Sequence, residues 1–243
     1  MAASPLDQFN IVPLIPLEIG GYDLAFTNSS LFMVFGLVVS LALMIIPMRR
    51  AVEIPQGWQH IPEMLYSFVR DLVADVSGNA ALPYVPFVFS VFMTVLMGNM
   101  LGMLPYSFTY TSHIIVTAAL GLLVIGAVIV LGFIHHGFGF LSVFAPPGLP
   151  KFIYLILIPI EVIAFMSRPL TLAMRLCANM TAGHTVLKVF ALFCVQLGLI
   201  FGMAPMLMNA IIVALELLLS SLQAYIFAIL TCVYLKDAVE AHH

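Results

Sequence analysis

Charged and amide side chains interrupt two long apolar segments of this sequence, residues 152–190 and 206–236. The first segment carries Glu161, Arg168, Arg175, Asn179, His184 and Lys188. The second carries Glu216, Ser220, Gln223 and Tyr234. An arginine at the centre of a membrane helix costs about 2.5 to 3.5 kcal/mol on insertion scales, so ionisable residues at that depth face a protein interior or a water-filled cavity. The pattern therefore predicts ion or proton transfer along these two segments.

Helical spacing places the acidic and basic residues of the first segment on one stripe. Glu161, Arg168 and Arg175 follow one another at intervals of seven residues. At about 100° per residue, each lies about 20° from the one before it. Asn179 lies one turn beyond Arg175, beside the same stripe.

A second polar face on the same segment is led by His184. It follows Arg175 by nine residues and points about 180° away from it, and Lys188 lies one turn further on. The same arithmetic puts three polar residues of the second segment on one face. These three residues are Glu216, Ser220 and Gln223. His184 could therefore meet Glu216.

The residue types of the two faces suit different tasks. A histidine titrates near neutral pH, so a His184–Glu216 pair suits proton relay. An arginine stays protonated, so Arg175 cannot relay protons well. It suits a fixed positive charge that attracts a passing carboxylate and blocks proton leakage.

Structural interpretations compete with these functional ones. Arg175 could pair with a buried glutamate for assembly alone, and Arg168 and Lys188 could extend to a membrane interface. Asn99, a polar residue in an apolar run, fits a packing hydrogen bond or a proton path equally well. Nearby, the spacing of Gly98 and Gly102 permits close helix approach, a weak signal. The secondary candidates are thus Asn99, Arg168, Lys188 and Tyr234.

Composition restricts the class of protein. Of 243 residues, 63% are hydrophobic and 8% are charged, with a mean hydropathy of +1.16, so the sequence predicts a polytopic membrane protein. A net charge of −3 gives no electrostatic case for nucleic acid. We expect no metal or cofactor, because Cys177, Cys194 and Cys232 lie in apolar segments without CxxC spacing. The first ten residues lack the basic and apolar regions of a signal peptide.

The elements expected to position these residues form an all-α fold in one membrane domain, residues 1–243. An extramembrane arm, 1–28, precedes a first span, 30–48. Residues 60–77 alternate apolar and charged positions at helical spacing, which predicts an amphipathic helix in the interface. Further spans are 85–104 and 113–136. The last two segments, 152–190 and 206–236, exceed the ~30 Å hydrocarbon core, so we expect a strongly tilted hairpin.

Basic residues at the ends of spans predict the orientation. The ends of three spans carry Arg49-Arg50, Lys151 and Lys236. These positions share one side of the membrane if the helix 60–77 does not cross it. The positive-inside rule then puts the N-terminus outside and the C-terminus in the cytoplasm or matrix. His242 and His243, at the end of the chain, receive no role.

The run SRPLTLAMRLCANMTAGH, 167–184, closely resembles the signature of subunit a of F-type ATP synthase. The run LELLLSSLQAYIFAILTCVYL, 215–235, resembles the last helix of that family. PLDQF at 5–9 and GNMLGMLPYSFTYTSH at 98–113 are also similar to family segments. The resemblance extends over most of the chain.

That resemblance implies a stator subunit beside a rotating ring of c subunits, each with an essential carboxylate. Two offset aqueous half-channels meet the ring near an essential arginine, which Arg175 matches within MRLCAN. Asn179, Gln223 and Glu161 match polar residues that accompany it. His184 and Glu216 exchange the Glu and His of some bacterial members, as in the mitochondrial-like branch, which suits a contacting pair. Arg168 departs from members with an uncharged residue there.

The family resemblance also implies partners and a location. The partners are the c ring, the peripheral-stalk b subunits, the rest of the synthase and the lipid bilayer. The location is a bacterial inner membrane, with the mitochondrial inner membrane as the alternative. The resemblance implies that the subunit itself catalyses no covalent bond formation. The sequence contains no GxxxxGK[ST] phosphate loop.

Two other classes of membrane protein are alternatives. A haem-binding subunit would use two of His113, His135, His136 and His184 at matching depth. An autonomous secondary transporter would show internal repeats between its halves, and none is visible.

Overall fold

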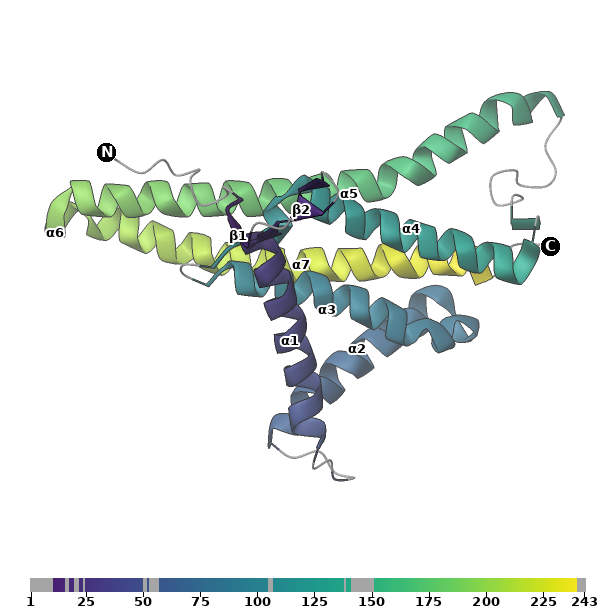
Figure 1. The fold of residues 1–243 in the computed structure, drawn as a ribbon, viewed down its shortest axis with the longest axis horizontal. Helices are drawn as coiled ribbons and strands as arrows, with labels where there is room; N and C mark the ends of the chain where they lie inside the picture. The colour runs from purple at the N-terminus through teal and green to yellow at the C-terminus, as the bar shows by residue number, and fades with distance from the viewer. Residues whose placement is uncertain are drawn as a thin grey trace. The chain divides into compact units, whose positions relative to one another are not determined.

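The computed structural model describes residues 11–15, 18–19, 22–23, 25–49, 52, 57–104, 107–137, 139–140 and 151–239. Five of its helices are long and apolar enough to cross a membrane (Figure 1). The predicted all-α polytopic membrane protein is thereby confirmed. The segment 5–9, most of the 137–151 loop, Arg50 and the histidine pair 242–243 lie outside the described residues.

The chain divides into two compact units, which are described separately. The first combines Met1–Ile46, Met93–Ile114 and Leu176–Ala224. The second combines Pro47–Phe92, Ile115–Arg175 and Tyr225–His243.

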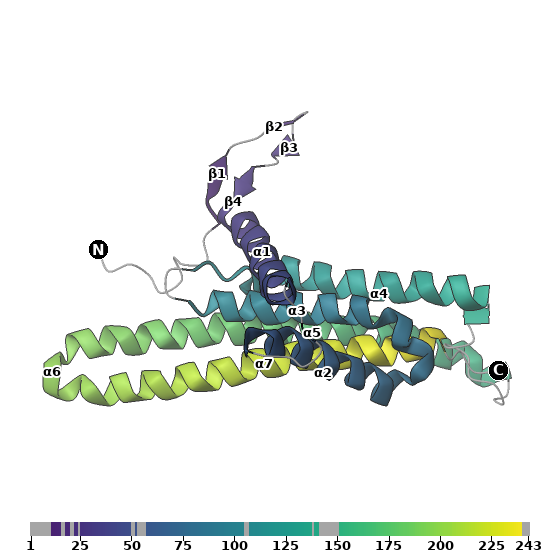
Figure 2. The ribbon, with the colours of Figure 1, turned by 90° about the horizontal axis from the view of Figure 1, so that it is seen from below.

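Short strands, which the composition did not predict, occupy the described part of the N-terminal arm. Strand β1 (Pro13–Ile15) pairs antiparallel with β4 (Phe26–Thr27), and β2 (Glu18–Ile19) pairs with β3 (Tyr22–Asp23) (Figure 2). Asn28 then begins helix α1 (Asn28–Met48), and its backbone and side chain both bond to Val12. These bonds join the strand pair to the start of α1.

The first unit packs around Tyr110, in the turn η4 (Tyr110–Ser112) that follows helix α3 (Val85–Gly102). A side chain at Gly98 would overlap the Tyr110 ring, and Gly36 of α1 also faces it. The Tyr110 hydroxyl donates to the Thr94 carbonyl at 3.3 Å, and burial raises the pKa of Tyr110 to about 12. Gly98 therefore makes room for an aromatic ring, and not for the neighbouring backbone that its spacing suggested.

The second unit contains the amphipathic helix α2 (His60–Ser77), at the residues where the sequence predicted it. Its apolar face buries Val69 and Val73, while Arg70 and Asp71 are exposed. The Ser77 hydroxyl donates to the Cys232 carbonyl at 2.7 Å, which ties the end of α2 to the last helix. The turn η3 (Asn79–Tyr84) connects α2 to α3.

A hydrophobic core in the second unit joins helix α4 (Ile114–His136) to the two longest helices, α5 (Lys151–Gln196) and α7 (Met203–Val239). Its members are Ile125, Val128, Phe140, Phe165, Tyr234 and Ala238. The Phe165 and Tyr234 rings meet edge to face at 5.0 Å between centroids. This core packs the part of α5 around Phe165 against the C-terminal part of α7.

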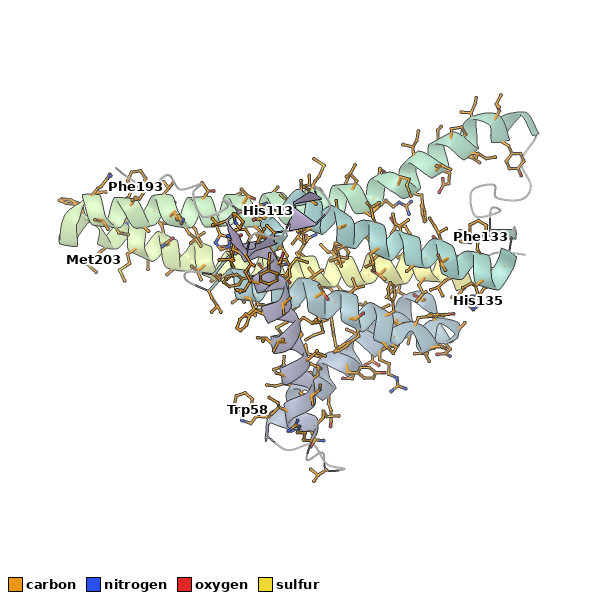
Figure 3. All side chains as sticks on the ribbon, in the orientation of Figure 1. Trp58, His113, Phe133, His135, Phe193 and Met203 are labelled. Carbon is orange, nitrogen blue, oxygen red and sulfur yellow. The ribbon has the colours of Figure 1, made fainter. Side chains whose placement is uncertain are left out.

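In the first unit, the second half of α5 and the first half of α7 lie side by side, joined by the short helix α6 (Gly198–Phe201) (Figures 1 and 2). Phe193 and Met203, one before and one after this turn, are both exposed (Figure 3). At about 1.5 Å per residue, 46 and 37 residues correspond to helices of about 69 Å and 56 Å. Both exceed a ~30 Å hydrocarbon core, so an apolar helix of either length must tilt or bend to remain within it.

Candidate functional site

Helix α7 carries three of the predicted site residues on one buried face. Glu216 is 2%, Ser220 0% and Gln223 4% exposed. Intervals of four and three residues keep them within one face of the helix. The positions between them, Leu217, Leu218 and Leu222, are exposed instead. In this part of α7 the polar residues are buried and these apolar ones are exposed, as suits a surface covered by lipid or by another apolar helix.

The structure brings Glu216 of α7 and His184 of α5 together. Their nearest atoms, Glu216 Oε1 and His184 Nε2, are 3.7 Å apart, and the histidine side chain is 14% exposed. That distance lies within the 4.0 Å of an ion pair but beyond the reach of a hydrogen bond. Two titratable groups are therefore placed for proton exchange after a small movement.

Gly183 provides the space that the Glu216 carboxyl group occupies. A Cβ atom at this position would lie 2.5 Å from Oε1 and 2.7 Å from the carboxyl carbon of Glu216. Such contacts are far below van der Waals distance. The absence of a side chain at residue 183 thus determines where the carboxyl group can lie next to His184.

Thr109 is a member of this site that sequence reasoning missed. Its hydroxyl lies 3.1 Å from His184 Nε2 and donates to the Gly102 carbonyl at 3.0 Å. Thr109 belongs to the connection between α3 and α4, within the run 98–113 that resembles a family segment, but no role of its own was assigned to it from the sequence. Only the order of polar and apolar residues in YSFTYTS could have drawn attention to it.

Asn99, a secondary candidate on α3, is completely buried and belongs to the same site. Its side-chain amide donates to the Ser220 carbonyl of α7 at 3.2 Å. The Ser220 hydroxyl makes a weak contact of 3.8 Å with Met103 Sδ. Asn99 thus links α3 to the polar face of α7, between the turns that carry Glu216 and Gln223.

Several buried polar atoms of this unit have no hydrogen-bond partner among the described residues. They include Asn99 Oδ1, Glu216 Oε1, Glu216 Oε2 and Gln223 Nε2. Buried polar groups of this kind are normally satisfied by ordered water or by another chain. The polar face of α7 therefore calls for partners that the described residues do not supply.

The remaining predicted residues of α5 have less enclosed positions. In the first unit, Asn179 and Lys188 are half-buried. In the second unit, Glu161 is half-buried and Arg168 and Arg175 are exposed. Within the described residues of that unit, no carboxylate lies within 4.0 Å of either guanidinium group. The pairing of Arg175 with Gln223 stays a prediction, because these residues belong to different units.

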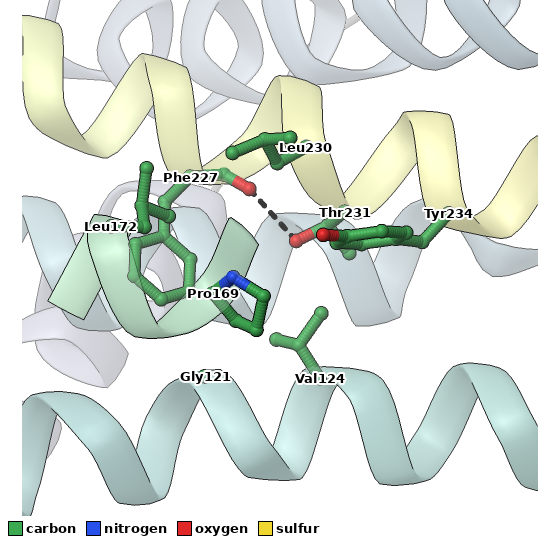
Figure 4. Close-up of a pocket in the computed structure, with 8 residues that line it drawn as sticks. All are labelled: Gly121, Val124, Pro169, Leu172, Phe227, Leu230, Thr231 and Tyr234. Atoms are coloured by element: carbon green, nitrogen blue, oxygen red, sulfur yellow. Dashed lines mark hydrogen bonds between the residues drawn. The ribbon is translucent and has the colours of Figure 1, made fainter. Parts of the chain in front are cut away.

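Tyr234 is buried in the second unit, beside a small pocket at Pro169 of α5 (Figure 4). Gly121 and Val124 of α4 face the pocket from one side and Phe227 and Thr231 of α7 from another. The Thr231 hydroxyl donates to the Phe227 carbonyl at 2.8 Å. Tyr234 is thus part of the apolar contact between α5 and α7 in the second unit, whereas His184 and Glu216 belong to the first unit.

Two histidines that a haem-binding subunit could have used already hold protein partners. His135 makes hydrogen bonds through both ring nitrogens, Nε2 to the Tyr84 hydroxyl at 3.0 Å and Nδ1 to the Leu131 carbonyl at 3.0 Å. His136 Nε2 lies 3.2 Å from the Val239 carbonyl. These contacts give both residues a structural role at the end of α4.

Comparison with known proteins identifies close relatives of the chain. A family model described as the ATP synthase A chain matches residues 30–236. ATP synthase subunit a of Mesorhizobium japonicum is 49% identical over 245 residues, covering 98% of this chain and 97% of that protein. The protein of the same name from Chelativorans is 49% identical over 250 residues, and that from Pelagibacter ubique 43% over 244, each covering both chains completely.

Proposed function

The chain belongs to the ATP synthase A chain family, and from that membership we propose that it conducts protons through two offset half-channels beside a rotating ring of c subunits. The family places the chain in the F-type ATP synthase, as a component of its proton-translocating machinery. Together with the five apolar helices among the described residues, the bacterial relatives support a multi-pass bacterial membrane protein. A haem-binding subunit and an autonomous transporter find no support in these relatives.

The observation that carries the proposal is the His184–Glu216 pair. Two groups that exchange protons lie 3.7 Å apart between α5 and α7, next to an otherwise apolar surface. Their neighbours Asn99 and Gln223 have polar atoms that water can bond. In the proposal, a proton from one side of the membrane passes this pair and reaches a carboxylate of the ring.

Arg175 is the fixed charge of the proposal. Its side chain is exposed and remains protonated, so it can attract an ionised ring carboxylate but cannot pass a proton on. By helical spacing, Ala178 and Ala182 continue its face of α5, and both are exposed. Small residues let a neighbouring membrane helix approach closely, which fits a ring helix that moves past Arg175.

The other assignments follow from the same scheme. We assign Asn179 and Gln223 to the surroundings of Arg175, and Glu161 to the second half-channel on the same stripe of α5. Protons then leave toward the cytoplasm, with the N-terminus outside and the C-terminus inside, as the basic residues at the ends of the spans indicate. The c ring and the b subunits of the peripheral stalk are the partners, and ATP chemistry belongs to the catalytic head.

Exchange of the two residue types tests the proposal. In inverted vesicles that contain the whole synthase, His184→Glu and Glu216→His should each lower ATP-driven proton pumping roughly tenfold or more, as for loss of an acid–base group. The double exchange should recover a substantial part of the rate. Ser221→Ala is the matched control, because the Ser221 hydroxyl bonds only to the Leu217 carbonyl of its own helix in the described structure. Single variants that pump like the wild type would refute the proposed path.

A further inference from the structure

We propose that Thr109 is a positioning residue for proton transfer at His184, an inference that rests on the proposed role of His184 in the proton path. The Thr109 hydroxyl holds the proton of His184 on Nε2, and it keeps that nitrogen out of hydrogen-bond reach of Glu216 between transfers.

The first step of the argument is the direction of the Thr109 hydroxyl. Helix α3 ends at Gly102, and the last carbonyls of a helix lack donors within the helix and carry partial negative charge. The Thr109 hydroxyl donates to the Gly102 carbonyl at 3.0 Å, and this carbonyl also accepts from the Ser107 hydroxyl at 2.8 Å. Gly102 also makes room for the threonine, since a Cβ there would lie 2.6 Å from Thr109 Cγ2. The single hydroxyl proton is therefore directed at the end of α3.

The protonation of His184 follows from that direction. A hydroxyl group has one proton to donate and can accept with its lone pairs. Because the proton of Thr109 points to Gly102, its oxygen accepts from His184 Nε2 at 3.1 Å. Before a transfer, while the Thr109 proton is directed at the Gly102 carbonyl, Nε2 therefore carries a proton. Toward Glu216, His184 presents a donor and not an acceptor.

Two distances distinguish the group that His184 bonds between transfers, Thr109, from the group that receives its proton, Glu216. The 3.1 Å separation from Thr109 is a hydrogen bond, whereas the 3.7 Å separation from Glu216 exceeds the usual 2.7–3.2 Å range by about 0.5 Å. Thr109 is itself held in place, because the backbone N–H and the hydroxyl of Ser112 donate to its carbonyl at 3.1 and 2.6 Å. His184 is thus the partner that moves.

The transfer of a proton from His184 to Glu216 uses the Thr109 hydroxyl first as an acceptor and then as a donor. In the charged ring, the Nε2–H bond breaks and an O–H bond forms on ionised Glu216, which leaves a neutral imidazole with its proton on Nδ1. The Thr109 hydroxyl then rotates from the Gly102 carbonyl and donates to the bare Nε2. A hydroxyl serves both states as acceptor and donor. A methyl group serves neither.

The test compares Thr109→Val with Thr109→Ser in the whole synthase. Valine keeps the shape and removes the hydroxyl, so ATP-driven pumping should fall about tenfold, within the ~10²-fold that misplacing a reacting group by 1 Å can cost. Serine keeps the hydroxyl and should pump at nearly the wild-type rate. Thr111→Val is the matched control in the same turn, because its buried hydroxyl has no hydrogen-bond partner among the described residues. Thr109→Ala repeats the test if valine prevents assembly.

Nitrogen-15 NMR of histidine in the reconstituted complex provides the second readout. The His184 signal is the one lost in His184→Gln. It should report a proton on Nε2 in the wild type and in Thr109→Ser, and a mixture of the two neutral forms in Thr109→Val. Unchanged pumping or an unchanged Nε2–H form in Thr109→Val would overturn the inference.

The two proposals can fail separately. If His184→Gln pumps normally, the proposed path through His184 is wrong, and the role of Thr109 falls with it. If His184→Gln abolishes pumping while Thr109→Val does not change it, only the positioning role of Thr109 is wrong.

Discussion

At the scale of single residues, the site depends as much on missing side chains as on charged ones. Gly183 leaves space for the Glu216 carboxyl group, and Gly102 leaves space for Thr109. Neither glycine takes part in proton transfer. Gly183 determines where the Glu216 carboxyl group can lie, and Gly102 determines where the Thr109 side chain can lie.

Gly183→Ala should reduce proton pumping without preventing assembly. The new Cβ would lie 2.5 Å from Glu216 Oε1, and the end of a flexible side chain can move away at little cost in stability. The carboxyl group then leaves its position beside His184, so we expect a loss of pumping of about tenfold. The measurement is ATP-driven acidification of inverted vesicles, normalised to the amount of assembled subunit.

Gly126→Ala is the matched control for this substitution. Gly126 also lies within a membrane helix, but a Cβ there meets nothing within 4 Å. Equal pumping by the two variants would show that the position of the Glu216 carboxyl group is unimportant.

Local sequence predicts some of these residues and not others. The contact between His184 and Glu216 follows from helical spacing on two segments that must pack together, and the structure has it. Thr109 lies 75 positions from His184, in a turn whose path no periodicity specifies. Gly183 could not be singled out either, because its importance depends on a side chain of another helix.

At the scale of helices, the hairpin of α5 and α7 depends on the turn at Gly198. Its φ of 72° is in the left-handed region, where side chains other than glycine are strained. The sequence predicted that α5 ends at residue 190. In the structure α5 continues to Gln196, because apolar residues follow Lys188 without a stop signal. The sequence predicts a turn around Gly198, Gly202 and Pro205, but the residue at which α5 ends depends on the backbone conformation at Gly198.

Substitutions at Gly198 should destabilise the hairpin in the order Val, Ala, Asn, with valine the worst. A Cβ at Gly198 meets nothing within 4 Å, so the cost is conformational alone, about 1–2 kcal/mol for alanine. Asparagine tolerates the left-handed region better. The temperature at which the subunit is lost from the purified complex measures the effect. Equal temperatures for asparagine and valine would contradict a conformational origin.

Helix positions were otherwise predictable from hydrophobic patterning. The helices α1, α2, α3 and α4 begin within two residues of the expected positions, because charges, prolines and glycines interrupt the apolar runs there. The strand pairs of the N-terminal arm were not predicted, since strands of two or three residues give no periodic signal.

At the scale of the whole molecule, composition alone predicts a polytopic membrane protein. The structure adds how a segment that connects two of its helices responds to pH. His113 lies just before α4 and stacks on Phe108 at 5.3 Å between ring centroids. Burial lowers the pKa of His113 below its ordinary 6.5. The unfolded chain therefore binds this proton at a higher pH than the folded chain does.

Stability should accordingly fall as the pH decreases through about 6.5, until His113 is protonated in the folded protein as well. His113→Gln removes this contribution and should show a smaller decrease in the temperature of subunit loss between pH 7.5 and 5. His60→Gln, at an exposed residue, is the control. A decrease as large in His113→Gln as in the wild type would exclude His113 as its source.

The central claim is that Arg175 separates two proton paths. The most direct measurement is ATP-driven pumping by inverted vesicles carrying Arg175→Ala, together with passive proton leak after removal of the catalytic head. Arg70→Ala, at an exposed arginine of α2, controls for loss of positive charge. We expect Arg175→Ala to abolish pumping while passive leak is retained or increased. Normal pumping by this variant would contradict the account and leave Arg175 with a role in assembly only.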